Sequence, residues 1–341
     1  MQTVQAARFG GPEVLEAGEA PDPVAGEGEV VIEVAAADVI MLDVLVRRGA
    51  PGPWAVEPPY VPGTGVAGRV ASVGTGVDAG WIGRGVAAKP GRAAVNAGSG
   101  SVAEAAEGTS PTGGYAQLAV APADALLEVP EGVALREAAA LVNDGMTAMQ
   151  ISQAARIGDG EKVLVMPAGG GLGSLLVQRA AAAGATVIAA AKGRRKLDLA
   201  RELGADHAFD YSESDWLERV RQVAGDGGVD VVLDGVGGEI GRASFDAAAR
   251  GGRFFAFGAP SGGFTRIDPQ ESRDRGVSVV GLMELPMEPG DQKRLPEAAL
   301  AEAAAGRLKP TVGQSYPLKQ ASDAHSAIEG RAVVGKTLLL P

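Results

Sequence analysis

The segment from residue 163 to residue 200 contains the pattern that most constrains how this chain can fold. It consists of an apolar run, a cluster of glycines, an alanine-rich helical stretch and a second apolar run. The dinucleotide fingerprint G-x-G-x-x-G also joins a strand to a helix, and its three positions fall here on Ala168, Gly170 and Gly173. The first would form the tight turn, the second would let the backbone approach a pyrophosphate, and the third would let the helix pack closely on the strand. The pattern predicts a nucleotide-binding strand–helix–strand unit, with a plain tight turn as the alternative.

Positive charge follows the second apolar run, TVIAAA, which ends at Ala191. An NAD-specific site places Asp or Glu at this point on the ribose 2′-hydroxyl, whereas basic side chains attract the 2′-phosphate of NADP. Four of the next five residues are basic: Lys192, Arg194, Arg195 and Lys196. We therefore expect NADPH as the cofactor, with Lys192, Arg194 and Lys196 at its phosphate. A solvated start to a helix is the alternative.

Strands alternate with helices from residue 162 onward, which predicts an α/β, doubly wound parallel sheet. KVLVMPA, TVIAAA, DVVLDGVGG, RFFAFGA and VSVVGLMEL are expected strands, and IGRASFDAAARGG is an expected helix. The N-terminal third instead contains short β segments separated by Gly and Pro, and the last fifty residues could rejoin it. We expect a mostly-β domain over residues 1–125 and 286–341, and a cofactor domain over residues 126–285.

Charge and cysteine content exclude several classes of function. The net charge of −11 argues against nucleic acid or an anionic membrane as the main partner. The absence of cysteine excludes disulfides, thiolate nucleophiles and cysteine-based zinc sites. We expect no signal peptide and no membrane span, because neither apolar pattern occurs in the sequence. The cytoplasm is the expected location.

Motifs along the whole chain resemble the medium-chain dehydrogenase/reductase superfamily. They are ARFGGPEVLEAGEAPDPVAGEGEVVIEVAAADV, YVPGTGVAGRVASVGTGV, GGYAQ, DGMTA, PAGGGLGS, ARELGADHAFDY and VGKTLLL, in the order that the superfamily keeps. The detailed pattern is similar to the zinc-free NADPH:quinone oxidoreductase, or zeta-crystallin-like, branch. This resemblance implies a GroES-like catalytic domain and a Rossmann domain that binds NADPH.

Three features agree with the zinc-free branch. Zinc alcohol dehydrogenases carry a catalytic Cys and a G-H-E motif, whereas the corresponding residues here are Gly63, Thr64 and Gly65. The loop at residues 91–114, expected to be a mobile surface loop, has none of the four cysteines of a structural zinc lobe. The A-x-G-G-x-G form of the glycine turn is also typical of this branch. We expect no catalytic metal.

The resemblance implies a set of cofactor contacts spread along the chain. Lys196 matches a lysine for the 2′-phosphate, and Tyr211 matches a tyrosine on the adenosine side. Thr147 would border the nicotinamide ribose, and Arg331 matches a C-terminal arginine that reaches the cofactor. The remaining contacts would be the glycine turn at the pyrophosphate and a strand end near the nicotinamide: Gly170, Gly171, Leu172, Gly173, Phe257 and Gly258.

The expected acceptor pocket is more apolar than is usual for the branch. Ile40 stands where the branch often has Asn, and Leu45 and Pro51 stand where pocket tyrosines are common. Trp54 would fill some of that space. We expect the pocket to be lined by Ile40, Leu45, Trp54 and Thr147, and to take a bulky, weakly polar acceptor.

The chemistry expected of such a chain is hydride transfer without zinc. His207 and His325 are expected to be structural, and Tyr60 and Tyr115 to serve packing, so no general acid can be named. Reduction of a quinone or an enone fits this set, because water can protonate the product. The alternatives are an enoyl reductase acting on a thioester or biosynthetic intermediate, and a cofactor-binding protein with little catalysis. The apolar segment at residues 277–285 is expected at a sheet edge, where it could pair across a two-fold axis in a homodimer.

Overall fold

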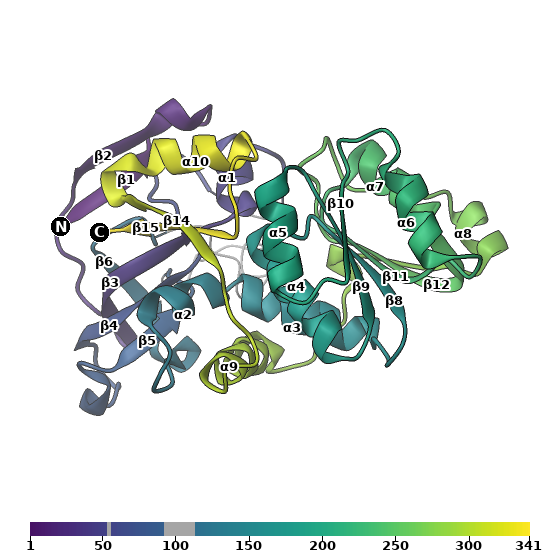
Figure 1. Cartoon of the computed structure of the whole chain (residues 1–341). Helices are drawn as coiled ribbons and strands as arrows, with labels where there is room; N and C mark the ends of the chain where they lie inside the picture. Colours follow the sequence, from purple (N-terminus) through teal and green to yellow (C-terminus); the bar gives the residue numbers. More distant parts are fainter. Residues whose placement is uncertain (53–55, 92–112) are drawn as a thin grey trace. The chain divides into compact units, whose positions relative to one another are not determined.

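The structure, a computed structural model, describes residues 1–52, 56–91 and 113–341 (Figure 1). Two compact units make up the chain. The first contains Met1–Met146 and Gly290–Pro341, and the second contains Thr147–Pro289. The domain boundaries after residues 125 and 285 stay predictions.

The first unit is built on a seven-stranded sheet with the order β14-β15-β3-β4-β5-β7, in which β6 also pairs with β3. Neighbouring strands are antiparallel, except for the parallel pair β14 and β15. A separate antiparallel pair is formed by β1 and β2. The strands of this unit are β1 (Gln2–Ala6), β2 (Leu15–Glu19), β3 (Glu29–Val39), β4 (Val66–Val73), β5 (Gly85–Ala88), β6 (Leu118–Pro122), β7 (Leu127–Glu128), β14 (Val312–Pro317) and β15 (Lys336–Leu340).

Strand β3 is the longest of this sheet and has partners on both sides. Its sequence, EVVIEVAAADV, is rich in β-branched residues, which favour a pleated, packed surface. Val30 and Ile32 are fully buried in the core of the unit, whereas Glu33 is exposed. Because β15 pairs with β3, the C-terminal strand completes the sheet that the N-terminal part begins.

The helices of the first unit lie between these strands in the sequence, and α9 is the longest of them. They are α1 (Met41–Arg47), α2 (Leu135–Leu141), α9 (Asp291–Ala304) and α10 (Ala321–Glu329), with single 3₁₀ turns at Pro12–Val14, Ala79–Trp81, Ala123–Ala125 and Leu318–Gln320. The mostly-β character expected of this part of the chain is confirmed.

The second unit contains a six-stranded sheet with the order β10-β9-β8-β11-β12-β13, and every pair in it is parallel. Its strands are β8 (Lys162–Met166), β9 (Thr186–Ala191), β10 (His207–Asp210), β11 (Val229–Asp234), β12 (Ala248–Ala256) and β13 (Ser278–Gly281). Its helices are α3 (Asp144–Ala155, which begins in the first unit), α4 (Gly171–Ala182), α5 (Arg194–Glu202), α6 (Trp216–Ala224), α7 (Gly238–Phe245) and α8 (Pro269–Arg275), with a 3₁₀ turn at Leu282–Glu284. The expected doubly wound α/β fold is confirmed.

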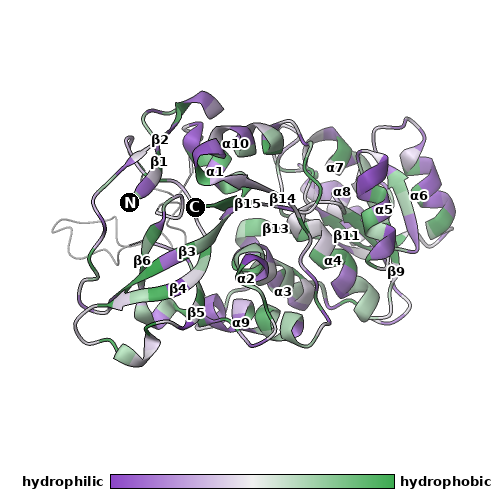
Figure 2. Cartoon of the chain, turned by 60° about the vertical axis from the view of Figure 1, so that its left-hand side comes forward, coloured by the Kyte–Doolittle hydropathy of each residue, from purple (hydrophilic) through white to green (hydrophobic). Residues whose placement is uncertain are grey.

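Helix α5 illustrates why these segments fold as they do. Polar side chains share the helix with leucines, so Figure 2 shows both purple and green along it. Leu197 and Ala200 are buried, while the basic residues at its start stay in contact with water. An amphipathic helix of this kind buries one apolar stripe on the sheet.

Two segments differ from the prediction. The helix expected over IGRASFDAAARGG ends at Phe245, and strand β12 begins at Ala248. Val229 N donates to Ala247 O at 2.9 Å, which starts the pairing of this segment with β11, and Gly251 adopts a positive φ of 77° that a helix does not allow. The strand expected over residues 277–285 is shorter, because a 3₁₀ turn follows Gly281; β13 is nevertheless the edge strand of its sheet, as expected.

Candidate functional site

The glycine turn connects the end of β8 to the start of α4. A Cβ built on Gly173 would lie 2.0 Å from Pro167 O, so only glycine lets the helix approach the strand this closely. A Cβ on Gly169 would lie 2.4 Å from the Cβ of Lys196. Gly170 is different, because its built Cβ would meet only Pro167 O, at 3.8 Å. Packing therefore requires glycine at two positions of the turn and leaves the surface of Gly170 open to a ligand.

Helix α4 begins directly at this turn. Ala168 is fully buried and its N–H donates to Ala190 O at 3.0 Å, which ties the turn to strand β9. The first N–H groups of the helix, at Gly171, Leu172 and Gly173, precede the point where intrahelical partners become available. Such N–H groups together with the helix dipole favour an anion. The turn fits a pyrophosphate of the kind that the sequence predicts.

The basic cluster follows β9. Lys192 and Arg194 are exposed, and the Arg194 side chain lies 3.6 Å from Asp198 at 93% exposure. Lys196 is half-buried against the glycine turn. The structure therefore brings Lys196 and the turn together, while Lys192 and Arg194 remain at the solvent side of the same helix start.

An acid that the sequence interpretation missed lies beside this cluster. Asp210 ends β10 and pairs in register with Ala191. Its Oδ2 accepts from Gly193 N at 2.7 Å, and its Oδ1 accepts from Ser212 N at 2.9 Å and from Ser212 Oγ at 2.6 Å. Burial would raise the pKa of Asp210, but the hydrogen bonds from Ser212 and Gly193 lower it. Both oxygens thus fix the turn that carries the basic residues, and Asp-x-Ser in DYS was the available signal.

The carboxyl ends of β10 and β12 carry three further predicted contacts. Tyr211 follows β10, is buried, and donates from its N–H to Ala191 O at 3.3 Å. Phe257 follows β12, and its ring occupies the space beside Gly235, where a Cβ would come within 2.5 Å of it. Gly258 lies against the same glycine, since its own Cβ would meet Gly235 O at 2.1 Å.

Asp234, at the end of β11, is a second residue that sequence reasoning missed. Its Oδ1 accepts from Val236 N at 2.8 Å and from Gly237 N at 3.0 Å, and its Oδ2 accepts from the hydroxyl of Thr265. Burial raises the pKa of this carboxyl. Asp234 therefore fixes the loop against which Phe257 packs, and its place before the glycines of DGVGG was the signal.

Two of the predicted acceptor residues lie in or next to α1, and a third is the first residue of the second unit. Ile40 precedes α1 and Leu45 lies within it, and both are half-exposed. Thr147, in α3, is half-exposed and is the first residue of the second unit. Trp54 and most of the 91–114 loop lie outside the described residues. Arg331 follows α10 in the first unit, half-buried, with a positive φ of 54°.

A buried polar network lies beneath α1. Asp43 accepts from Ile40 N at 2.9 Å, from Thr64 Oγ1 at 2.7 Å and from the Tyr115 hydroxyl at 3.4 Å. The Tyr115 hydroxyl lies 2.8 Å from His325 Nε2. Tyr115 and His325 therefore form a hydrogen bond with each other, in addition to packing in the core.

This network shifts the pKa of its members. Burial, with the negative charge of Asp38, raises the pKa of Asp43 to about 7. Burial, with the positive charge of Arg47, lowers the pKa of His325 to about 3. Arg47 is itself fully buried and pairs with Glu329 of α10. The network fixes the segment that contains Ile40 and Leu45. No local sequence pattern predicts this network.

A second group of buried polar side chains lies where β15 pairs with β3. Lys336 Nζ lies 3.3 Å from Asp38 Oδ2 and 3.1 Å from Asp144 Oδ2, and Asn143 Nδ2 donates to Asp38 Oδ2 at 2.9 Å. Burial raises the pKa of Asp38. An acid in the apolar run AAADV and a lysine in GKTLLL were the only signals.

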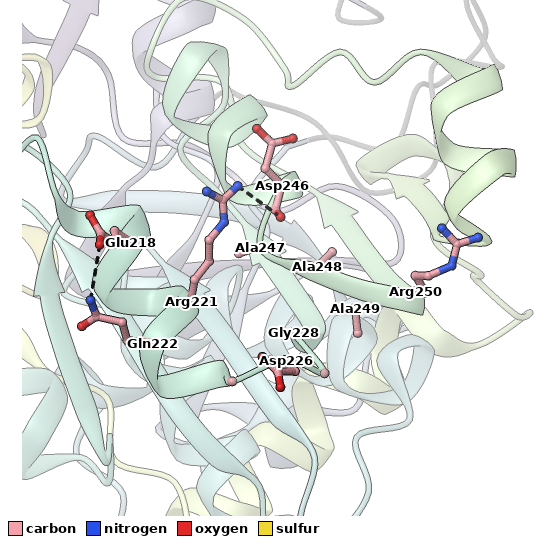
Figure 3. A pocket seen from close by; sticks show the side chains of 12 residues that line it. Glu218, Arg221, Gln222, Asp226, Gly228, Asp246, Ala247, Ala248, Ala249 and Arg250 are labelled. Carbon is pink, nitrogen blue, oxygen red and sulfur yellow. Dashed lines mark hydrogen bonds between the residues drawn. The ribbon is translucent and has the colours of Figure 1, made fainter.

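A hollow of the second unit lies away from the glycine turn. Figure 3 shows it between the end of α6 and the segments that precede β11 and β12, with Arg221, Asp246 and Arg250 on its wall and a volume of about 770 Å³. These residues lie at the amino ends of the strands. Ligands of open α/β sheets bind at the carboxyl ends, where the glycine turn lies. The hollow is therefore not the candidate site.

Over residues 1–52, 56–91 and 113–341, His, Asp and Glu side chains form no group of three that could hold a metal ion. Among the helices described, none combines the length and the apolar character needed to cross a bilayer.

Comparison with known proteins gives a consistent result. Residues 26–131 match the alcohol dehydrogenase GroES-like domain, and residues 171–302 match the zinc-binding dehydrogenase domain. A 2-haloacrylate reductase of a Burkholderia species is 33% identical over 93% of this chain and 92% of its own length. The crystal structure of an NAD-dependent alcohol dehydrogenase has a TM-score of 0.86 at 34% identity, with 100% of both chains covered. The Escherichia coli quinone oxidoreductase complexed with NADPH also has a TM-score of 0.86, at 29% identity and with 100% of both chains covered. The chain therefore belongs to the medium-chain dehydrogenase/reductase superfamily and is of its zinc-free quinone oxidoreductase type.

Proposed function

We propose that the protein is an NADPH-dependent oxidoreductase that reduces a quinone or an activated C=C, such as that of an enone, without zinc. The glycine turn closed by Lys196 carries this proposal, because it joins a pyrophosphate cradle to a basic group at the expected 2′-phosphate position. The NADPH complex of the E. coli quinone oxidoreductase and the 2-haloacrylate reductase among the relatives support the cofactor and the acceptor class.

The residues proposed to hold NADPH are those already expected. The turn from Ala168 to Gly173 would bind the pyrophosphate, and Lys196, with Lys192 or Arg194, the 2′-phosphate. Tyr211, Phe257, Gly258, Thr147 and Arg331 complete the proposed contacts. When bound, the nicotinamide supplies the hydride, and the protein supplies orientation and electrostatics.

The acceptor is proposed to bind against Ile40, Leu45, Trp54 and Thr147. Ile40 and Leu45 are apolar and partly exposed, and the polar groups around them are engaged in the Asp43 network. Such a wall selects a weakly polar acceptor and limits water around the reacting carbon.

The proposal extends to assembly and location. Strand β13 is a sheet edge, and Met283 just beyond it is 81% exposed, which supports a homodimer formed at this edge. The acidic, cysteine-free composition supports the cytoplasm.

The deciding experiment follows NADPH and NADH oxidation with a panel of quinones, enones, 2-haloacrylates and enoyl thioesters, and NAD⁺ or NADP⁺ reduction with alcohols. We expect NADPH oxidation with a quinone or enone that persists after treatment with a chelator. Preferential turnover of thioesters would favour an enoyl reductase. Alcohol oxidation, which the NAD-dependent structural relative raises as a second candidate, would contradict the proposal. Cofactor binding without turnover would leave a binding protein.

A further inference from the structure

Lys89 lies directly after strand β5, and its side chain is half-buried. Its Nζ lies 3.5 Å from the thioether sulfur of Met146, and this ammonium has no other hydrogen-bond partner within the described part of the chain. An ammonium has three N–H donors, and a thioether is only a weak acceptor. Lys89 therefore has donors to offer to a ligand.

The strand register explains which residues surround Lys89. Val66 of β4 pairs with β3 on one side and with β5 on the other. One residue further along each strand, the same register places Asp38, Gly65 and Lys89 opposite one another. Residues opposite each other in antiparallel strands point to the same face of the sheet. The hydrogen bond from Asp38 N to Gly65 O, at 3.0 Å, continues that register.

Gly65 leaves the middle of this row without a side chain. A Cβ at this position would lie 2.8 Å from Asp38 Oδ1, so the carboxylate leans over the glycine. Asp38 Oδ1 is buried and has no hydrogen-bond partner among the described residues, whereas Oδ2 is held by Lys336 and Asn143.

Two interactions connect Lys89 to residues that neighbour the proposed acceptor residues in the sequence. Its contact residue Met146 directly precedes Thr147, and Asp38, whose charge acts on Lys89, lies two residues before Ile40. Thr147 and Ile40 are both proposed acceptor residues. The carboxylate whose charge acts on Lys89 thus belongs to the strand that leads into Ile40.

Burial lowers the pKa of Lys89, and the negative charge of Asp38 opposes part of that effect. The other charged groups at this point are Lys336 of β15 and Asp144 of α3, and both are paired in the Asp38 cluster. Because the effect of burial is the larger of the two, the Lys89 ammonium is a stronger acid than the ammonium of an exposed lysine.

We propose that Lys89 is a catalytic residue of the reduction: its ammonium binds the carbonyl oxygen of the conjugated acceptor and supplies the proton that completes the reaction. This role rests on the proposed function. Hydride addition at the β-carbon moves the C=C electron pair toward the carbonyl and leaves negative charge on its oxygen. The ammonium stabilises this enolate through a charge-assisted hydrogen bond.

The proton transfer then balances the reaction. One N–H bond of Lys89 breaks, and its proton joins the α-carbon of an enone or the oxygen of a quinone. The acceptor has gained one hydride and one proton, and Lys89 is left as a neutral amine. Water returns the proton to the amine, so no further oxidant or reductant is needed.

The first test compares Lys89→Met and Lys89→Arg with the unmodified protein. Methionine keeps the length and the apolar contact with Met146 but removes the charge, so kcat and kcat/KM should fall together by about 10²–10³-fold. Arginine keeps the charge but cannot donate its proton readily, and should retain intermediate activity. NADPH affinity, measured by fluorescence titration, should be unchanged in both variants. Lys293→Met is the matched control, because Lys293 is an exposed lysine of the same unit that donates to Asp124 O at 2.8 Å.

The second test uses the unmodified protein and does not depend on the variant folding. The chain has eight lysines, so their reactivity toward a limiting amine-acylating reagent can be followed one by one by mass spectrometry. A saturated ketone corresponding to an accepted enone, added together with NADP⁺, should protect Lys89 and leave Lys293 reactive. The reactivity of Lys89 against pH should also show a midpoint below the ordinary lysine value of 10.5.

The outcomes separate the two proposals. An unmodified protein that reduces no acceptor contradicts the proposed function. A protein that reduces acceptors, but whose Lys89→Met variant stays within about threefold in kcat, contradicts the role of Lys89 alone. If that variant does not fold, absence of ketone protection at Lys89 overturns the role, and protection together with the lowered midpoint supports it.

Discussion

Lys196 lies directly against Gly169: a Cβ built on Gly169 would come 2.4 Å from the Cβ of Lys196 and 2.9 Å from its Cα. The turn after β8 and the start of α5 therefore fit together only because Gly169 has no side chain. This contact links the two parts of the sequence that predicted a phosphate-rich ligand, the glycine cluster and the basic run.

Exchange of the turn glycines should separate packing from ligand binding. In Gly169→Ala the new methyl group must displace Lys196, so the unfolding free energy should fall by about 1–3 kcal/mol. Gly170→Ala is the matched control, because its methyl group meets only Pro167 O at 3.8 Å and its φ of −90° suits alanine. We expect Gly170→Ala to keep the melting temperature but to weaken NADH and NADPH alike. Equal melting temperatures for the two variants would contradict the packing role of Gly169.

Removal of the Lys196 charge should change cofactor preference. A charge-assisted contact with the 2′-phosphate is worth about 1.5–3 kcal/mol, so Lys196→Ala should weaken NADPH binding roughly 10- to 150-fold and leave NADH nearly unchanged. Arg194→Ala is a useful comparison, because that side chain is 93% exposed and should matter less. Isothermal titration with both cofactors measures the effect. Equal affinity of the unmodified protein for NADH and NADPH would refute the assignment.

His325 should make the protein sensitive to mild acid. Burial lowers its pKa to about 3 in the folded chain from an ordinary value of 6.5, so the unfolded chain binds a proton that the folded chain refuses. The stability from this group is complete above pH 6.5 and is lost as the pH falls toward 3, by up to ~1.4 kcal/mol per pH unit. His325→Gln cannot titrate and should remove this slope from urea unfolding measured between pH 6.5 and 4. An unchanged slope would show that His325 is charged in the folded protein.

Asp43 should act in the opposite direction. Its pKa is raised to about 7 from an ordinary value of 3.8, so the folded chain keeps a proton that the unfolded chain releases. Its contribution to stability is complete below pH 3.8 and is lost as the pH rises through 7. In Asp43→Asn, the unfolding free energy should therefore increase with pH more steeply between 4 and 6.5 than in the unmodified protein. The same urea series serves as the measurement, and a shallower dependence in this variant would count against the raised pKa.

The periodic parts of the fold could be predicted, and the buried polar groups could not. Alternating strands and helices, and the glycine turn, are local patterns, so the parallel sheet and the start of α4 followed from the sequence. Asp38, Asp144 and Lys336 are far apart in the sequence and meet only because β15 pairs with β3. Asp43 and His325 are joined through Tyr115 in the same non-local way.

One error in the predicted elements has a tertiary cause. The apolar, alanine-rich run after Phe245 satisfies helix propensity, but pairing with β11 and the positive φ of Gly251 turn it into the start of β12. Tertiary pairing outweighs the propensity of short alanine runs, which amounts to only a few tenths of a kcal/mol per residue.

The last prediction concerns the wall that should face the acceptor, and helix α1 provides both the test and its control. Leu45 is half-exposed, whereas its neighbour Val44 is fully buried. Leu45→Ala should enlarge the acceptor pocket and change the ratio of kcat/KM between bulky and small acceptors by about 10-fold or more. The reason is that one methylene group in an apolar pocket changes transition-state binding by about 1–3 kcal/mol. NADPH affinity and melting temperature should stay close to those of the unmodified protein. Val44→Ala should do the reverse, lowering the unfolding free energy by about 1–3 kcal/mol through a cavity while leaving the acceptor ratio alone. If Leu45→Ala only destabilises the protein, or alters cofactor binding without a change in acceptor ratio, Leu45 serves the core and the acceptor lies against a different wall.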